Sequence, residues 1–477
     1  MQLVAGVDCS TQGTKVVVVD VEGGRVVAAG RAAHEVSGRG GARETDPQDW
    51  SRALAAALGQ TGRAREVAAV SVGGQQHGLV VLGGDGQPLR PAVLWNDTRS
   101  APDAEALVVD GGGPETWAED VGVVPVASFT VTTWAWLRRT EPDVADAART
   151  LRLPHDEVTT RLVGRSVTDR GDASGTGWWS TRDEAYATQV LALERVRLDP
   201  ALLPAVLGPG EPAGTVTDGA AEAFGLPPGI PVGPGTGDNM AAALGLALPA
   251  GTAALSLGTS GTVYATSERR PADPSGTVAG FADATGRFLP LACTLNATLA
   301  VDRVAAWLGL DREAVEDGGE VVVLPYLDGE RTPNLPSAAG TIAGLRHDTT
   351  PGQILRAAYE GAVVSLLDAL DRVAEQAGGL TPAAPLVLIG GGARGRVWRD
   401  TVARLSGRPL LVPAAEELVA LGAAAQAAAV LTGEPPAEVA TRWGASRGAL
   451  VDPLPRDDDS LARHRAVRAT TDSLNRC

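Results

Sequence analysis

Lysine is nearly absent from this chain of 477 residues. Of its 41 basic residues, 40 are arginine and only Lys15 is lysine. Aromatic residues are also scarce, at 4% of the sequence, so a surface on which basic side chains alternate with aromatic ones is not expected. The preference for arginine indicates a compositional bias, and the one lysine that escapes it needs an explanation.

Positive charge is in short supply overall. The formal net charge is −16 and the isoelectric point is near 4.9, so the chain as a whole repels a phosphate backbone. We therefore expect no nucleic-acid partner. A small anionic ligand can still bind through backbone N–H groups and one or two cations.

Cysteine is rare as well. Cys9, Cys293 and Cys477 are isolated and lack metal-ligand spacing, which favours a reducing compartment and a cytoplasmic location over a disulfide framework. The five histidines are too scattered to propose a zinc site. The N-terminus does not resemble a signal peptide, and the apolar run at 418–431 is too short to span a bilayer, so we expect a buried helix there and no membrane partner.

The length predicts two domains, and the element pattern predicts an α/β fold. Two segments, 3–20 and 252–268, share a strand, a polar turn and a second strand. Two others, 67–78 and 384–395, run an apolar strand into consecutive glycines, while helical patterns lie between them. This repeated layout indicates a duplication. We place the boundary near residue 240, giving domains 1–238 and 239–477.

The turn between Asp8 and Lys15 carries groups that suit phosphate binding. Its glycine lets backbone N–H groups face an anion, hydroxyl groups such as that of Thr11 donate hydrogen bonds, and the lysine supplies positive charge. The carboxylate of Asp8 can hold Mg²⁺. An ordinary polar hairpin is the alternative for this turn alone, but the Gly/Thr-rich turn at 256–262 offers a second phosphate site in the other half.

Asp238 and Asn239 end a glycine-rich loop before an alanine-rich helix. The carboxylate of Asp238 could simply cap that helix. Flanking glycines also let a ligand approach the backbone, and an aspartate there can take a proton from a hydroxyl group as a general base. Both interpretations remain open on these residues alone.

A dense group of polar side chains follows the strand at 67–74. It comprises amide, imidazole, indole, carboxylate and guanidinium groups, at Gln76, His77, Trp95, Asn96, Asp97 and Arg99. Such groups suit a polyhydroxylated ligand, which needs many directional hydrogen bonds. The alternative is a buried histidine with a packed tryptophan.

A competing signal lies near the C-terminus. Gly390, Gly392 and Gly395 follow a strand in the G-x-G-x-x-G pattern, and Glu416 comes about one βαβ unit later, as in dinucleotide-binding proteins. An NAD-dependent dehydrogenase is therefore the rival hypothesis. It leaves the paired Gly/Thr turns unexplained. The sequence has no P-loop motif, nor the HRD and DFG elements of protein kinases.

Taken together, these motifs resemble the FGGY family of carbohydrate kinases, and within it the xylulokinases. The resemblance rests, in chain order, on GVDCSTQGTK, GGQQHG, VLWNDTR, LPHD, GTGDN, SLGTSGT, LPYLDGERTPN, LIGGGARGRVWRD and ALGAA. Two departures are Gln76-His77, where many xylulokinases have Met-His, and Cys9-Ser10, where many have Leu-Gly. These departures leave the sugar preference open.

The resemblance implies two actin-like, ribonuclease H-like domains flanking a central cleft, with sugar bound mainly by the first and ATP by the second. It implies direct in-line transfer from ATP to D-xylulose, with Mg²⁺ as cofactor. Other family substrates, namely ribulose, rhamnulose, gluconate and glycerol, remain alternatives, as does a non-catalytic nucleotide switch. Oligomeric state is open, a homodimer being one arrangement.

The resemblance also implies roles for single residues. Asp238 would be the general base and Asp8 would position Mg²⁺. The implied sugar contacts are Gln76, His77 and Asn239, to which our reading of the residues adds Trp95, Asp97 and Arg99. The implied nucleotide contacts are Thr11, Lys15, Gly258 and Thr259 at the phosphates and Gly391 and Gly392 at the adenosine. The DGERTP segment at 328–333 is a family marker without a role that we can derive, and a buried ion pair is one interpretation of its charges.

Overall fold

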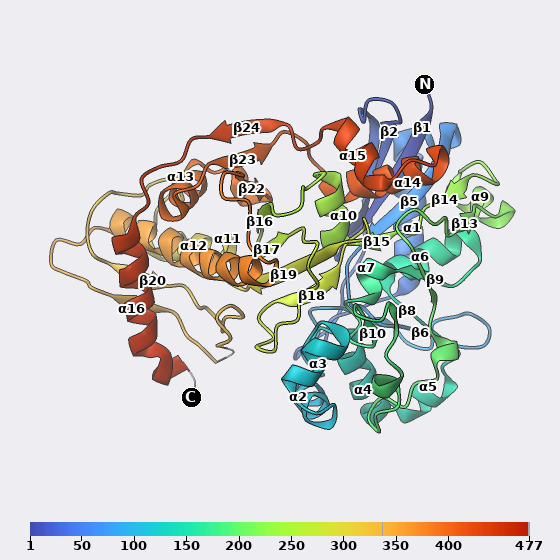
Figure 1. Cartoon of the computed structure of the whole chain (residues 1–477), viewed down its shortest axis with the longest axis horizontal. Coiled ribbons are helices and arrows are strands. Elements are labelled where there is room, and N and C mark those ends of the chain that lie inside the picture. The colour runs from blue at the N-terminus through green and yellow to red at the C-terminus, as the bar shows by residue number, and fades with distance from the viewer. Residues whose placement is uncertain (336, 476–477) are drawn as a thin grey trace. The chain divides into compact units, whose positions relative to one another are not determined.

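A computed structural model describes residues 1–335 and 337–475 (Figure 1). The chain forms two compact units, each assembled from three segments. Unit 1 comprises Met1–Leu248, Arg270–Leu289 and Ala415–Ser446. Unit 2 comprises Pro249–Arg269, Pro290–Ala414 and Arg447–Cys477. The division at residues 238 and 239 stays a prediction.

Unit 1 is built on a mixed sheet. Its strands, in spatial order, are β13 (Gly214–Thr215), β14 (Pro231–Val232), β5 (Val67–Gly74), β1 (Leu3–Cys9), β2 (Gly13–Asp20) and β3 (Val26–Ala33), with β15 (Thr236–Gly237) also beside β5. Strands β1, β2 and β3 form an antiparallel meander, whereas β5 runs parallel to β1 and β15 parallel to β5.

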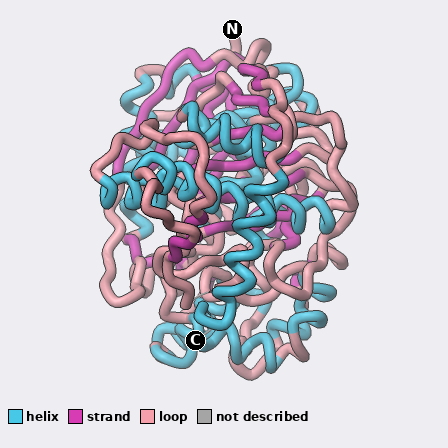
Figure 2. The backbone as a smooth tube through the Cα atoms, turned by 90° about the vertical axis from the view of Figure 1, so that its left-hand side faces the viewer, coloured by secondary structure: helices cyan, strands magenta, loops and turns pink. Residues whose placement is uncertain are grey.

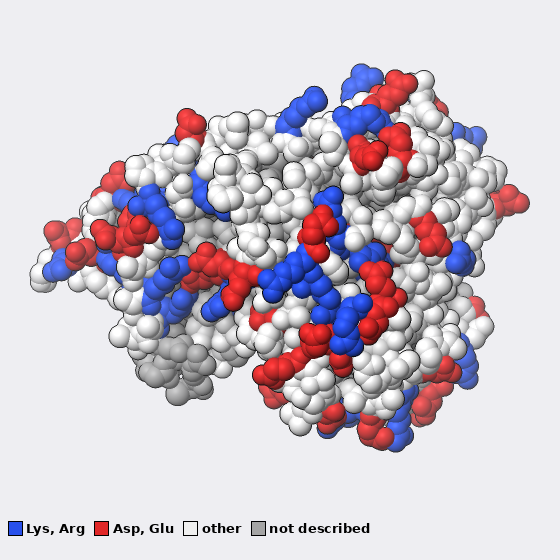
Figure 3. All heavy atoms as spheres, in the orientation of Figure 1, with Lys and Arg blue, Asp and Glu red and all other residues white. Residues whose placement is uncertain are grey.

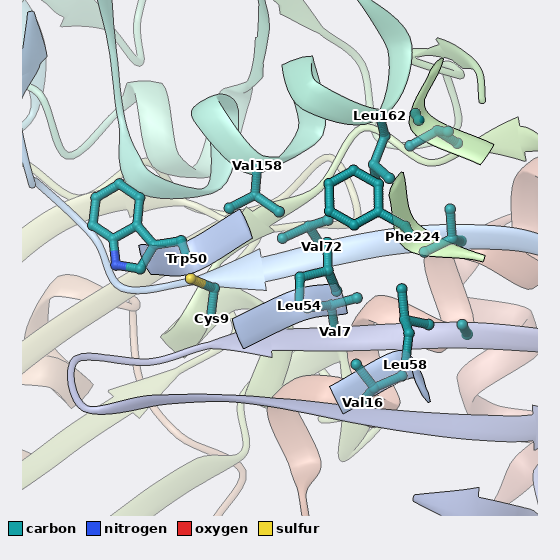
Figure 4. Close-up of a cluster of buried hydrophobic side chains, with 14 of the residues drawn as sticks. Val7, Cys9, Val16, Trp50, Leu54, Leu58, Val72, Val158, Leu162 and Phe224 are labelled. Carbon is teal, nitrogen blue, oxygen red and sulfur yellow. The ribbon is translucent and has the colours of Figure 1, made fainter. Parts of the chain in front are cut away.

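One face of this sheet carries the core shown in Figure 4. Alternate residues of β1, among them Val7 and Cys9, point to this face, as the two-residue period of a strand requires. Helix α1 (Pro47–Thr61) covers them with Trp50, Leu54 and Leu58, which lie on one face of the helix because they are four residues apart.

The opposite face packs against α10 (Asp238–Gly245) and α14 (Leu418–Thr432). A Cβ atom at Gly6 would lie 1.9 Å from the carbonyl oxygen of Ala420, so only glycine lets α14 come this close to β1. The red helices α14 and α15 (Pro436–Trp443) accordingly lie beside the blue strands of unit 1 (Figure 1). The predicted buried helix at 418–431 is confirmed.

None of the helices in the described residues is by itself long and apolar enough to cross a membrane. The one pair that would be, α14 with α15, is bent by 119°.

The other elements of unit 1 surround this sheet. The helices are α2 (Ala101–Asp110), α3 (Pro114–Val121), α4 (Thr130–Thr140), α5 (Pro142–Ala147), α6 (Pro154–Val163), α7 (Arg170–Ala173), α8 (Thr188–Leu191) and α9 (Asp218–Phe224), with 3₁₀ turns at Ala64–Glu66 and Pro200–Leu202. The short strands are β4 (Glu44–Thr45), β6 (Val80–Leu82), β7 (Ala92–Val93), β8 (Thr150–Arg152), β9 (Val167–Asp169), β10 (Trp179–Ser180), β11 (Ala185–Tyr186), β12 (Ala205–Leu207) and β18 (Ala279–Ala282).

Unit 2 is built on a second mixed sheet. Its strands, in spatial order, are β19 (Phe288–Thr294), β17 (Gly261–Ala265), β16 (Ala253–Leu257), β22 (Leu386–Ile389), β23 (Leu410–Pro413) and β24 (Gly448–Val451). The other elements are β20 (Val322–Leu324), β21 (Thr341–Ala343), α11 (Thr298–Leu308), α12 (Pro351–Gln376), α13 (Arg396–Ser406), α16 (Asp458–Asn475) and a 3₁₀ turn at Gly391–Arg394.

The two sheets repeat one plan. In unit 2, β16 and β17 form an antiparallel hairpin continued by β19, and β22 runs parallel to β16, just as β5 runs parallel to β1 in unit 1. Both predicted hairpins and the predicted alternation of strands and helices are therefore confirmed, and Figure 2 shows helices and strands mixed along the chain. The α/β fold class follows from this layout.

Candidate active site

The site of unit 1 lies where three parallel strands end. In register, Asp8 of β1 is level with Gly73 of β5, and Gly237 of β15 is level with Gly74. Residues that follow these positions must therefore emerge at one edge of the sheet. That edge carries Asp8, Gln76 and Asp238, although Asp8 and Asp238 are 230 residues apart in the sequence. Ligands of open α/β sheets commonly bind at the carboxyl ends of the strands.

Lys15 and Asp8 are direct cross-strand partners in the β1–β2 hairpin. Cys9, next to Asp8, and Val16, next to Lys15, both point into the core. Because successive side chains of a strand point to opposite faces, Asp8 and Lys15 point to the face that α14 covers. Lys15 Nζ lies 2.7 Å from Oε2 of Glu417, the residue that precedes α14, and 3.9 Å from Asp8 Oδ2. Burial lowers the pKa of Lys15, but the hydrogen bond to Glu417 and the charge of Asp8 outweigh it, so the net direction is upward. The lone lysine is thus a cation held between two carboxylates.

Asp8 is buried at 5% exposure, and its Oδ1 atom has no hydrogen-bond partner. Burial raises the pKa of this carboxyl to about 6; Lys15 opposes the rise and Glu417 adds to it. A buried, unpaired carboxylate oxygen is costly unless something else satisfies it. The unpaired Oδ1 atom of Asp8 is therefore suited to bind a cation.

Asp238 begins α10 and is half-buried. Its Oδ1 accepts hydrogen bonds from the backbone N and the Nδ2 of Asn239, at 2.8 and 2.9 Å. The same Nδ2 donates to Gln76 Oε1 at 2.9 Å. Burial, followed by the charges of Asp8 and Asp172, raises the pKa of Asp238 to about 7 despite these bonds. A carboxylate with such a pKa, within reach of solvent, suits a general base near neutral pH.

His77, three residues after the end of β5, has a positive φ of 66°. Its Nδ1 lies 2.8 Å from the carbonyl oxygen of Gly175, and its ring packs edge-on against Phe129 at 5.0 Å. A Cβ atom at Gly175 would come within 2.6 Å of the imidazole. A fixed imidazole in an uncommon backbone conformation is typical of functional sites.

The side chains of the loop at 94–99 make two separate sets of contacts. Trp95 is exposed and donates from Nε1 to Thr11 Oγ1 at 3.0 Å, so it reaches the turn between Asp8 and Lys15. Asp97 instead accepts hydrogen bonds from the backbone N of Arg43 and from the N, Nε and Nη2 of Arg99. Arg99 also bonds Glu44 and lies 4.3 Å over the ring of Trp136.

The carboxylate of Asp97 and the guanidinium of Arg99 are therefore already engaged with protein groups. These contacts support the loop that carries Trp95. A sugar contact by Asp97 or Arg99 stays a prediction.

Sequence reasoning missed one group next to the site. His155 and Asp172 are fully buried and hydrogen-bonded at 2.7 Å, and the charge of Asp172 helps to raise the pKa of Asp238. The LPHD motif that contains His155 was noticed only as part of the family resemblance. Nothing in the sequence indicated that residue 155 meets residue 172.

The predicted nucleotide residues of unit 2 lie at the ends of β16 and β22. Gly258 accepts from the N and Oγ1 of Thr298 at the start of α11, at 3.1 and 2.8 Å. A Cβ atom at Gly392 would lie 2.8 Å from Leu257 Cβ, whereas one at Gly391 would meet open space. Gly392 thus permits close packing and Gly391 leaves room for a ligand. With Thr259, which is exposed, these positions stay predicted nucleotide contacts.

The DGERTP segment contains no buried ion pair. Glu330 is buried and accepts hydrogen bonds from the backbone N of Leu295, of Asn296 and of Arg331, and from Asn296 Nδ2. Burial raises its pKa, and these bonds oppose the rise. The interpretation as an ion pair is wrong because N–H groups occupy the carboxylate. Glu330 instead fixes the chain that leads into Thr298 and so supports the turn at Gly258.

Charged groups elsewhere are interspersed rather than segregated. On the face shown in Figure 3, basic and acidic side chains lie side by side. Among residues 1–335 and 337–475, no three His, Cys, Asp or Glu side chains are grouped to hold a metal ion by themselves. A cation here would need ligands from a substrate as well.

Comparison with known proteins agrees with this geometry. The model of the N-terminal domain of the FGGY family of carbohydrate kinases matches residues 3–245, and that of the C-terminal domain matches residues 253–431. The chain is 62% identical over 464 residues to a protein named xylulose kinase from Streptomyces coelicolor, covering 97% of this chain and 95% of that protein. A similarly named protein from Streptomyces rubiginosus is also 62% identical, over 462 residues, with the same coverage.

Solved structures give the same result. The crystal structure of xylulose kinase from Bifidobacterium adolescentis matches with a TM-score of 0.85 and 36% identity, over 98% of this chain and 99% of that chain. The predicted pair of actin-like α/β domains is confirmed, and the G-x-G-x-x-G segment of the dehydrogenase hypothesis lies inside the C-terminal family match. The chain therefore belongs to the FGGY family of carbohydrate kinases.

Proposed function

We propose that this kinase transfers the terminal phosphate of ATP to D-xylulose, giving D-xylulose 5-phosphate, with Asp238 as the general base. The observation that carries the proposal is the half-buried carboxylate of Asp238 at the strand ends, with one oxygen fixed by Asn239 and a pKa near 7. The choice of D-xylulose rests on the names of the relatives that are 62% identical over almost the whole chain.

The hydrogen bonds of Asp238 distinguish its two oxygens. Oδ1 is engaged by the N and the Nδ2 of Asn239. We therefore assign Oδ2 as the atom that takes the proton from the attacking sugar hydroxyl. The aligned, deprotonated hydroxyl then attacks the phosphorus directly, with no phosphoenzyme, because positioning and charge neutralisation supply most of the catalysis in phosphoryl transfer.

The sugar contacts in this proposal are side chains that the protein already holds in place. Gln76 is fixed through Asn239, His77 through Gly175, and Trp95 through Thr11. Because these groups are ordered before the sugar arrives, little conformational entropy is lost on binding. We expect them to select for the arrangement of hydroxyl groups in a ketose.

Mg²⁺ is the expected cation of the reaction. Asp8 fits it, since its buried Oδ1 lacks a hydrogen-bond partner and a carboxylate oxygen is a ligand that this ion prefers. When bound, the ion supplies positive charge to the phosphate oxygens. Lys15 adds a second cation beside Asp8 and can exchange Glu417 for phosphate. A cytoplasmic location is part of the proposal, and Cys9 and Cys293 are both free thiols.

The test is ADP release measured with D-xylulose, ribulose, rhamnulose, glycerol and gluconate in turn. The proposal predicts release that depends on sugar and is fastest with D-xylulose. Faster turnover of another sugar would replace the substrate but keep the kinase. ATP binding without sugar-stimulated release would favour the nucleotide switch, and reduction of NAD would favour the dehydrogenase.

A further inference from the structure

The chain that leads to Asp238 contains a bulge. Strands β14 and β15 both run parallel to β5, and Val232 of β14 pairs with Val70 of β5. Thr236 of β15 pairs with Gly73. The chain therefore uses four residues to cover a distance that β5 covers in three, so one extra residue bulges out between β14 and β15. Bulges next to an active site redirect the side chains that follow them.

The bulge depends on glycine. Gly235 has a φ of 77°, in the left-handed region that favours glycine. A Cβ atom at this position would lie 2.6 Å from His155 Cδ2 and 2.8 Å from the carbonyl oxygen of Val72. At Gly233 a Cβ atom would lie 2.7 Å from Ser71 Oγ. A larger residue at either position would push the bulge away from β5.

The buried amide of Gln426, on α14, holds the bulge in place. Its Nε2 donates to the carbonyl oxygen of Gly235 at 3.0 Å, and its Oε1 accepts from Ser71 Oγ, on β5, at 3.1 Å. Gln426 is 1% exposed and Ser71 is fully buried. Because a carbonyl oxygen only accepts, Nε2 must face Gly235, and the rotatable hydroxyl of Ser71 donates to Oε1. The amide thus ties the bulge to β5.

The same helix also packs closely on α10, which begins with Asp238. A Cβ atom at Gly422 of α14 would lie 1.8 Å from the carbonyl oxygen of Ala241 in α10. Two backbones in such close contact transmit a shift of one to the other. Helix α14 therefore supports the chain on both sides of Asp238, through α10 after it and through the Gln426 hydrogen bond to Gly235 before it.

We propose that Gln426 is a positioning residue: by holding Gly235 against β5, its amide determines where β15 ends and where the carboxylate of Asp238 lies. Without this hydrogen bond the buried carbonyl of Gly235 would lose its partner, which is costly. The bulge would then shift toward another donor. Asp238 follows only three residues later, so the shift would move its Oδ2 relative to the sugar hydroxyl. The inference rests on the proposed function, since it gives Asp238 the role of base.

The test compares Gln426→Met with Gln426→Glu. Methionine has nearly the same volume but makes neither hydrogen bond, so we expect kcat for the sugar to fall roughly 10- to 100-fold, as for a displaced catalytic group. The KM for ATP should stay unchanged. A protonated glutamate can accept from Ser71 and donate to Gly235, and burial favours the protonated form. Assayed against the parent at about pH 6, Gln426→Glu should therefore recover most of the loss.

The matched control is Thr61→Val in α1. Thr61 is also buried in unit 1 and donates from Oγ1 to a backbone carbonyl oxygen, that of Leu58, at 2.6 Å. Its hydrogen bonds stay within residues 58–63. We expect Thr61→Val to lower the melting temperature, as Gln426→Met does, but to keep the parent's kcat. A purely structural Gln426 would give the same result as this control.

A folded Gln426→Met protein with the parent's kcat would overturn the proposal. So would a Gln426→Glu protein that is no more active than Gln426→Met. Ser71→Ala provides a second route if Gln426→Met does not fold. It removes the donor to Oε1 and loosens the amide, so kcat should fall less than in Gln426→Met, again without a change in the KM for ATP. Parental kcat in Ser71→Ala would contradict the proposed support.

Failure of the proposed base gives a different result. Turnover near that of the parent in Asp238→Ala would show that Asp238 is not the base, whatever Gln426 does. Loss of turnover in Asp238→Ala together with parental turnover in Gln426→Met would keep the base and reject only the positioning role. If the parent protein prefers a different sugar, the same variants are compared on that sugar.

Discussion

Replacing Asp8 with asparagine should make the protein more stable while removing its activity. Asp8 is buried with one oxygen unpaired, and its pKa rises from 3.8 to about 6, chiefly through burial. At about 1.4 kcal/mol for each pKa unit, keeping this group ionised costs the folded state ~3 kcal/mol. Asparagine removes that charge, and Lys15 keeps Glu417 as its partner.

The sign of the effect depends on pH. The folded protein binds the proton of Asp8 more tightly than the unfolded chain does, so protonation favours folding below about pH 4. That stabilisation is lost as pH rises through about 6. Urea unfolding should therefore give Asp8→Asn a gain of up to ~3 kcal/mol at pH 8 and less than about 1 kcal/mol at pH 4.

Asp97→Asn is the matched control, because Asp97 is also a buried carboxylate in unit 1. Its oxygens are fully engaged by Arg43 and Arg99, so the same substitution should lower the unfolding free energy by about 1–3 kcal/mol. An Asp8→Asn protein that is less stable than the parent at pH 8, or equally stable, would refute the reasoning.

Three further predictions follow from the described contacts. Because Asp238 must be ionised to accept a proton, kcat/KM for the sugar should rise with pH and level off above about 7; a profile flat from pH 5 to 8 would contradict this. Lys15→Arg should raise the KM for ATP, since a planar guanidinium does not replace a compact ammonium between Asp8 and Glu417; unchanged kinetics would make the lone lysine an accident of composition. Glu330→Gln should lower the unfolding free energy in urea by about 1–3 kcal/mol, because the new amide faces N–H donors; no change would remove Glu330 as a support.

The sequence contained enough to predict the fold and one edge of the site. Each Gly/Thr-rich turn connects two apolar strands, so both hairpins could be recognised locally, and the repeated strand that ends in glycines indicated the duplication. Since parallel strands end at the same sheet edge, Asp8, Gln76 and Asp238 could be expected to converge. These features depend on short-range patterns.

The rest depends on contacts between distant residues. The pair of Lys15 and Glu417 joins residues 402 apart, and no local pattern selects Glu417. His155 and Asp172 come from separate helices, and their burial together is visible only in three dimensions. Glu330 was misread because its charge suggested a cationic partner, whereas backbone N–H groups satisfy it.

The central step of the proposed mechanism is the transfer of a proton from the hydroxyl group of D-xylulose to Asp238. The most direct test is the rate of ADP release with saturating D-xylulose, for the parent and for Asp238→Ala, together with calorimetric titration of ATP. We expect kcat to fall by about 10²- to 10⁴-fold, as for loss of a general base, while the affinity for ATP is retained. Turnover near that of the parent would contradict it.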